Sequence, residues 1–152
     1  MQVVADTSFL VALMNPRGMW HARAVALNAA LLTADATVSL FDCVIAEAIS
    51  TAVRRLHEKG YASQVGKLFL WLNEHVHDES ITWVLPDVPR LYTAVMDLIR
   101  ATNGQLNFND ALLALACRER CIAAIATFDS DFRQIAWLRC LASPADVTQA
   151  IS

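Results

Sequence analysis

The sequence predicts an α/β protein, a three-layer α/β/α sandwich with a mainly parallel central sheet. The chain of 152 residues is 56% hydrophobic and only 18% charged, which suits a sheet that is covered on both faces. Short apolar runs alternate with segments of helical periodicity, as expected when right-handed crossovers join parallel strands. No internal repeat or linker interrupts this order, so we expect a single domain over residues 1–152.

The first half of the chain contains two expected strands and four expected helices. The first strand is apolar and stops at Asp6, where Asp6, Thr7 or Ser8 can cap the helix that follows. Asp42 can cap the longest helix of this half, which Gly60 ends. The expected elements are strand 2–5, helix 9–14, helix 20–32, strand 37–40, helix 42–59 and helix 61–74.

The second half continues the alternation, and residues 107–132 are its most informative stretch. Within that stretch, a short apolar run at residues 122–127 has the length and composition of a fully buried strand. The expected elements are strand 81–85, a helix that ends near residue 101, a helix capped by Asn107, strand 122–127, strand 137–141 and a terminal helix from Pro144 or Ala145.

Composition argues against several classes of protein. No apolar run approaches the roughly 20 residues that span a bilayer, and the N-terminus lacks the basic segment of a signal peptide, so we expect a cytoplasmic protein with no membrane partner. The formal charge of -3 means that any nucleic acid must be held by a local basic patch or by metal ions. The four cysteines form no CxxC pair, which favours buried reduced thiols over a zinc site.

Acidic residues recur at one edge of the predicted sheet. Asp6 follows the first strand, Glu47 lies in the helix after the second, Asp110 precedes the fourth strand in the first turn of a helix, and Asp129 and Asp131 follow that strand. Ligands of parallel sheets bind outside the carboxyl ends of the strands. Converging carboxylates repel one another unless cations compensate them, and oxygen ligands suit Mg²⁺ or Mn²⁺. Such a site favours hydrolysis of a phosphodiester.

Each acid also has a purely structural explanation. Asp6 can cap the helix 9–14, Asp110 can share a cap with Asn107, and Asp129 can cap a turn. Glu47 lies opposite the apolar side of its helix, where a solvated surface glutamate is expected. Separate capping acids have no reason to share one edge of a sheet, and this coincidence favours a common site.

The chain resembles the PIN domain family, and within it the small VapC-type toxin ribonucleases. The similar motifs are Val-Val-Ala-Asp-Thr-Ser-Phe-Leu-Val at 3–11, Trp-His at 20–21 with Ala24, Ile-Ala-Glu at 45–47, Asn-Asp-Ala-Leu at 109–112 and Thr-Phe-Asp-Ser-Asp-Phe at 127–132. The resemblance implies that Asp6, Glu47, Asp110 and Asp129 are catalytic and bind Mg²⁺ or Mn²⁺, that Asp131 is an additional ligand or supports one, and that Thr7, Ser8 and Thr127 orient carboxylates or water.

The function implied by this resemblance is a Mg²⁺- or Mn²⁺-dependent endoribonuclease, the toxin of a toxin–antitoxin pair. It further implies a homodimer and an antitoxin that covers the active groove. Two alternatives remain open, a PIN-like module that binds RNA or a protein without cutting, and a stand-alone RNA-processing nuclease. A calcium loop is disfavoured because Gln134 and Cys140 replace its glycine and glutamate, and a receiver domain is disfavoured because no lysine follows Lys67.

Arg54 is the residue expected to bind RNA. It follows Glu47 by seven residues and therefore shares its helix face, from which it can reach a phosphate in the cleft. The alternative is that Arg54 only solvates the helix. Two apolar faces, Leu68 with Leu72 and the face of Leu91, Val95 and Leu98, can supply either an oligomer surface or core packing.

Overall fold

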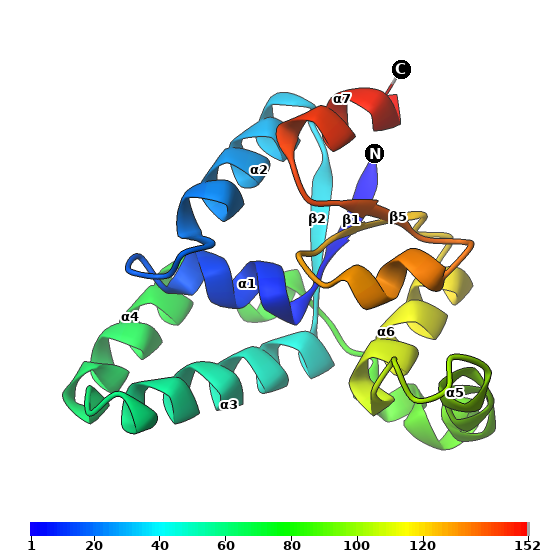
Figure 1. Cartoon of the computed structure of the whole chain (residues 1–152), viewed down its shortest axis with the longest axis horizontal. Helices are drawn as coiled ribbons and strands as arrows, with labels where there is room; N and C mark the ends of the chain where they lie inside the picture. The colour runs from blue at the N-terminus through cyan, green and yellow to red at the C-terminus, as the bar shows by residue number, and fades with distance from the viewer. Residues whose placement is uncertain (152) are drawn as a thin grey trace.

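The computed structural model describes residues 1–151, and within them it contains five strands that form one sheet (Figure 1). The strands are β1 (Gln2–Ala5), β2 (Thr37–Phe41), β3 (Ile81–Thr82), β4 (Ala124–Ala126) and β5 (Arg139–Leu141). Their order in the sheet is β3-β2-β1-β4-β5, and every neighbouring pair is parallel. The carboxyl ends of β1 and β4 therefore lie side by side at one edge.

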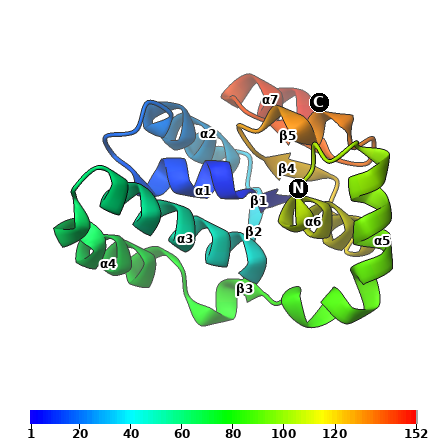
Figure 2. The same ribbon diagram turned by 60° about the horizontal axis from the view of Figure 1, so that its bottom comes forward.

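Helices cover both faces of this sheet, which confirms the predicted three-layer α/β/α class. The helices are α1 (Thr7–Met14), α2 (His21–Thr33), α3 (Asp42–Glu58), α4 (Val65–His75), α5 (Val88–Ala101), α6 (Phe108–Glu119) and α7 (Pro144–Ile151). Figures 1 and 2 both show α1 between α2 and α3. None of the helices in the described part of the chain has the length and apolar character needed to cross a membrane.

Alternating side chains of the strands supply two apolar cores. Val3 and Ala5 pack on one face of the sheet with Leu27 of α2, whereas Val4 packs on the other face with Leu112 of α6. Both faces of β1 are thus buried, which explains why its sequence is continuously apolar rather than alternating.

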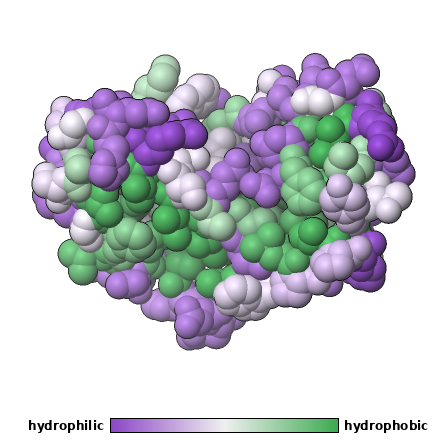
Figure 3. Space-filling view, turned by 90° about the horizontal axis from the view of Figure 1, so that it is seen from below, coloured by the Kyte–Doolittle hydropathy of each residue, from purple (hydrophilic) through white to green (hydrophobic). Residues whose placement is uncertain are grey.

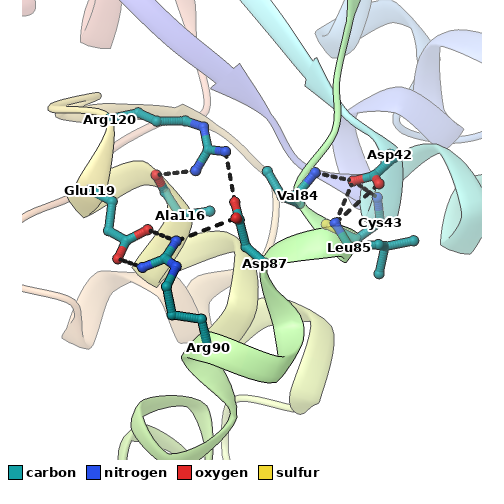
Figure 4. Close-up of polar contacts among 9 residues, drawn as sticks. All are labelled: Asp42, Cys43, Val84, Leu85, Asp87, Arg90, Ala116, Glu119 and Arg120. Carbon is teal, nitrogen blue, oxygen red and sulfur yellow. Dashed lines mark hydrogen bonds and ion pairs between the residues drawn. The ribbon is translucent and has the colours of Figure 1, made fainter.

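The third strand is shorter than the predicted strand 81–85, and the carboxylate of Asp42 explains the difference. Asp42 is the first residue of α3, with Phe41 rather than Asp42 at the N-cap position. The buried Asp42 carboxylate accepts the backbone N–H of Val84 at 2.8 Å and of Leu85 at 3.1 Å, as Figure 4 shows. These two N–H groups are therefore withdrawn from the sheet, and β3 ends at Thr82.

Three other predicted boundaries also differ for local reasons. Residue 122 belongs to the turn after α6, because the N–H of Ile122 bonds the carbonyl of Cys117 at 2.9 Å, and β4 begins only at Ala124. Trp137 lies outside β5, and its indole Nε1–H donates to the carbonyl of Ala114 at 3.0 Å. The predicted helix 61–74 starts as a 3₁₀ turn, Ala62–Gln64, before α4.

Ion pairs connect the start of α5 to the end of α6 (Figure 4). Arg90 donates two hydrogen bonds to Glu119 at 2.6 and 2.8 Å, and Arg120 donates one to Asp87 at 3.0 Å. The hydrogen bond from Arg120 is the main reason why the pKa of Asp87 lies below its usual value. The Arg90–Glu119 pair is solvent-exposed and the Arg120–Asp87 pair is partly buried, so the first positions the two helices more than it stabilises the protein.

The apolar faces that the sequence offered as an oligomer surface belong to the core instead. Leu68 and Leu72 of α4, and Leu91 and Val95 of α5, are all buried in the same hydrophobic cluster. They are covered within one chain because α4 and α5 pack their apolar stripes inward.

Candidate active site

A cleft of about 870 Å³ opens where β1 and β4 end, with α1, α3, the first turn of α6 and the residue before α2, Trp20, contributing to its walls. The structure places all four predicted catalytic acids in this cleft, although they come from distant parts of the sequence. They are Asp6, Glu47, Asp110 and Asp129.

Asp6 lies directly after β1 and is held by three donors. Its Oδ2 accepts the backbone N–H of Ser8 at 3.1 Å, the Ser8 hydroxyl at 2.6 Å and the Thr127 hydroxyl at 2.8 Å. Burial raises the pKa of Asp6, and the hydrogen bonds from Ser8 and Thr127 oppose that rise. Ser8 and Thr127, both predicted as orienting residues, therefore favour the ionised carboxylate and fix its direction.

Glu47 lies on α3 and is half-buried rather than a solvated surface residue. The hydroxyl of Thr7 donates to Glu47 Oε2 at 3.0 Å, across from α1. Thr7 therefore orients the carboxylate of Glu47, as Ser8 and Thr127 orient that of Asp6. All three hydroxyls predicted to orient carboxylates contact acids of the cleft.

Asp110 forms a reciprocal cap at the start of α6. The N–H of Asp110 donates to Asn107 Oδ1 at 3.0 Å, and the N–H of Asn107 donates to Asp110 Oδ2 at 3.2 Å. Burial, followed by repulsion from Asp6, Glu47 and Asp129, raises the pKa of Asp110 to about 7. The other three carboxylates are therefore close enough to contribute to the raised pKa of Asp110.

Asp129 caps the 3₁₀ helix Ser130–Gln134, and its Oδ1 accepts the N–H of Asp131 at 2.8 Å. The Thr127 hydroxyl in turn accepts the N–H of Asp129 at 2.9 Å. Asp131 does not line the cleft, so the structure does not bring this predicted fifth ligand together with the four acids. The backbone of Asp131 completes the turn, whereas its carboxylate contributes nothing to that turn.

Each of the four cleft acids has one oxygen anchored by the hydrogen bonds described above. For Glu47, Asp110 and Asp129 the other oxygen accepts none from the described residues, whereas Asp6 also interacts with the backbone N–H of Thr7. The anchored atoms are Asp6 Oδ2, Glu47 Oε2, Asp110 Oδ2 and Asp129 Oδ1. Every fully buried polar side-chain atom in residues 1–151 has a partner, so the unanchored oxygens must be open to solvent. The cleft thus presents four oriented oxygen donors.

These donors fit a hydrated Mg²⁺ or Mn²⁺. No three His, Cys, Asp or Glu side chains of the described residues stand close enough to enclose an ion by themselves. Mg²⁺ keeps several waters and binds through one or two carboxylates together with substrate phosphates, so an open set of acids suits it. A cation in the cleft would also offset the repulsion that raises the pKa of Asp110.

Basic residues at the C-terminal end of α3 line the same cleft as the acids. Arg54 does so as predicted, and its Nε lies 3.8 Å from Glu58 Oε1 on the solvent-exposed side of the helix. Arg55 and Lys59 also line the cleft, and the sequence interpretation missed both of them. The signal that could have found Arg55 was its position after Arg54, because a spacing of eight residues places it about 80° from Glu47 around the helix, still toward the same side.

An aromatic pair on the opposite wall was also missed. The rings of Trp20 and Phe128 stack with centroids 5.3 Å apart and an interplanar angle of 23°. The guanidinium carbon of Arg23 lies 4.7 Å from the Trp20 ring and 5.5 Å from the Phe128 ring. Residue type alone could not reveal a contact between positions so far apart in the chain.

Fold and cleft together define a class, a parallel α/β/α domain with oxygen donors for a cation at the carboxyl edge of its sheet. The model of the PIN domain family matches residues 3–138, so the chain belongs to that family. PIN domains are generally nucleases.

One solved structure with a similar fold is that of VapBC2 from Rickettsia felis bound to a DNA fragment from their promoter. The two chains are 16% identical, and the similarity covers 93% of this chain and 98% of the other with a TM-score of 0.63. At this identity the similarity shows the shared fold. No curated protein matches the sequence.

Proposed function

We propose that this PIN domain is a Mg²⁺- or Mn²⁺-dependent endoribonuclease and the toxin of a type II toxin–antitoxin pair in the cytoplasm. The observation that carries the proposal is the arrangement of the four acids, which line one cleft and each have one oxygen anchored by a hydrogen bond. RNA, rather than another phosphodiester, is supported by the similarity of the motifs to those of VapC-type ribonucleases.

The chain's own residues would prepare the cleft for hydrolysis. Ser8 and Thr127 hold Asp6, and Thr7 holds Glu47, so two of the carboxylates are fixed before any substrate arrives. Arg54 and Arg55 lie where they can bind phosphates of the RNA strand. A divalent cation, when bound, would supply the activation of water and the stabilisation of charge on the phosphate.

An antitoxin would find a second groove beside the cleft. This groove has a volume of about 420 Å³ and includes apolar side chains such as Leu56 and Trp71. Arg17 and Lys67 also line it, and Arg55 and Lys59 belong to both the groove and the cleft. An acidic segment with apolar residues could therefore bind here and reach the active site.

Lys67→Glu should weaken the complex with a co-expressed antitoxin in a pull-down, and undiminished capture would contradict this assignment.

A homodimer would use apolar residues that one chain leaves exposed. Figure 3 shows two apolar regions on the lower face, one toward α4 and one toward α5. The exposed residues include Leu70, Trp83 and Tyr92, with 63%, 61% and 53% of their surfaces accessible. Sedimentation of Leu70→Glu combined with Trp83→Glu should show a monomer where the natural chain is a dimer; a dimer in both would move the interface elsewhere.

The proposed activity is tested by incubating the purified protein with a mixture of single-stranded and structured RNAs in Mg²⁺, Mn²⁺ or EDTA. We expect cleavage with either metal, none in EDTA, and a loss of about 100-fold or more in Asp6→Asn and in Asp110→Asn. Asp97→Asn is the matched control, because Asp97 is an exposed aspartate of α5 that does not line the cleft.

The non-catalytic alternative predicts a different result in the same assay. If no metal supports cleavage while RNA still binds, and neither cleft variant alters that binding, the acids are structural and the nuclease assignment is wrong.

A further inference from the structure

Trp20 and Phe128 place a rigid aromatic surface on the wall of the cleft. Phe128 is anchored from the core side, since its ring centroid lies 6.2 Å from that of Phe9, which is fully buried. Trp20 covers Phe128 from the outside and still exposes 40% of its own surface. Phe128 directly precedes Asp129, so this surface borders the carboxylates.

Arg23 adds a positive charge to that surface. It is exposed on the first turn of α2, and it forms no ion pair with any acid among residues 1–151. Its contacts with the Trp20 and Phe128 rings hold the guanidinium beside them, while its N–H donors stay available for a ligand.

The charges of the cleft suggest how a nucleic acid strand would lie in it. The floor carries acids, which repel phosphates, and Arg54 and Arg55 line the cleft on the α3 side. Arg23 lies on α2 beside the aromatic pair, and α1 separates α2 from α3 (Figures 1 and 2). A nucleic acid strand that crosses the floor can therefore place one phosphate near α3 and another near α2, with the scissile phosphate between them over the acids.

We propose that Trp20, Phe128 and Arg23 form a nucleotide subsite, in which an unpaired base of single-stranded RNA packs against the aromatic pair and Arg23 binds the neighbouring phosphate. This inference rests on the proposed ribonuclease function and specifies its substrate class. A base within a duplex has its faces covered by its neighbours, so the subsite selects RNA that is single-stranded next to the cut.

The test compares two ligands in EDTA at low ionic strength, where no cleavage occurs. One is a fluorescent single-stranded octaribonucleotide of mixed sequence, and the other is the same ribose-phosphate chain without bases. Trp20→Leu should weaken binding of the octaribonucleotide by about 5- to 150-fold and leave binding of the abasic chain unchanged. Trp20→Phe should retain most of the affinity, and Arg23→Gln should weaken both ligands alike.

Two variants outside the cleft serve as controls. Phe69 is an aromatic residue of α4 that is 44% exposed, Arg100 is a surface residue of α5, and neither lines the cleft. Phe69→Leu and Arg100→Gln should bind both ligands as the natural chain does. Thermal unfolding of each variant shows whether it is folded.

A cross-linking experiment on the natural chain gives an answer that needs no substitution. Octaribonucleotides with 5-bromouridine should cross-link to Trp20 or Phe128 on irradiation, as mapped by mass spectrometry. The inference is overturned if cross-links form only elsewhere, if the natural chain binds both ligands equally, if it binds neither, or if Trp20→Leu impairs only binding to a protein partner.

The same measurements separate this inference from the proposed function. A protein that cuts RNA but shows no base-dependent binding at Trp20 keeps its nuclease assignment and loses the subsite. A protein that shows base-dependent binding at Trp20 but cuts no RNA with any metal keeps the subsite and loses the nuclease assignment.

Discussion

At the scale of single residues, the acids of the cleft combine two roles that the sequence presented as alternatives. Asp6, Asp110 and Asp129 each cap a helix or turn through one carboxylate oxygen, and each also lines the cleft. Capping therefore does not compete with a cation site. It holds the carboxylate in position, so that little conformational entropy remains to be lost when a ligand binds.

Asp110 gives a prediction about stability and pH. Because its pKa is raised from 3.8 to about 7, folded protein binds this proton more tightly than unfolded protein does. In EDTA the contribution of Asp110 to the free energy of unfolding is thus greatest below about pH 4, declines as the pH rises toward 7, and is fully lost above that. We expect Asp110→Asn to raise the free energy of unfolding at pH 8 by about 1 to 3 kcal/mol, measured by urea unfolding.

Metal provides the control for the Asp110 prediction. Mg²⁺ should raise the thermal midpoint of the natural chain at pH 8 by more than that of Asp110→Asn, since the ion stabilises only a cleft with its full charge. If Asp110→Asn is no more stable than the natural chain at pH 8 in EDTA, charge repulsion among the carboxylates does not destabilise the metal-free protein.

At the scale of elements, apolar runs and caps were sufficient to predict most strands and helices. The exact ends were harder, because distant side chains determine them. Asp42 shortens β3 by accepting N–H groups about 40 residues away in the chain, and the indole of Trp137 bonds to a carbonyl in α6 rather than extending β5. Neither partner can be read from local propensity.

Asp42 offers a test of that long-range connection. In Asp42→Ala the buried N–H of Val84 loses its acceptor, so we expect the free energy of unfolding to fall by about 1 to 3 kcal/mol in urea. Asp97→Ala removes an exposed aspartate that pairs with Arg100, and it should change stability by less than about 0.5 kcal/mol. Equal effects of the two substitutions would mean that Asp42 does not hold the start of α3 to the segment after β3.

At the scale of the whole molecule, the parallel order of the sheet assembles the site. It brings Asp6 and Asp129 to one edge, and the helices add Glu47 and Asp110. The sequence predicted Asp6 and Asp129 because a parallel sheet gathers the carboxyl ends of its strands, whereas the roles of Glu47 and Asp110 depended on the resemblance to PIN domain motifs. It could not predict the Trp20–Phe128 contact or that Asp131 does not line the cleft, because both depend on the paths of loops between elements.

If the four cleft acids form one cation site, diffraction from crystals soaked in Mn²⁺ should locate the ion there. Anomalous scattering at the manganese edge should give a peak in the cleft bound by Asp6 and at least one other of the four acids, and Asp6→Asn crystals should lack it. Strong peaks elsewhere, with none in the cleft at saturating Mn²⁺, would mean that the four acids do not form a cation site.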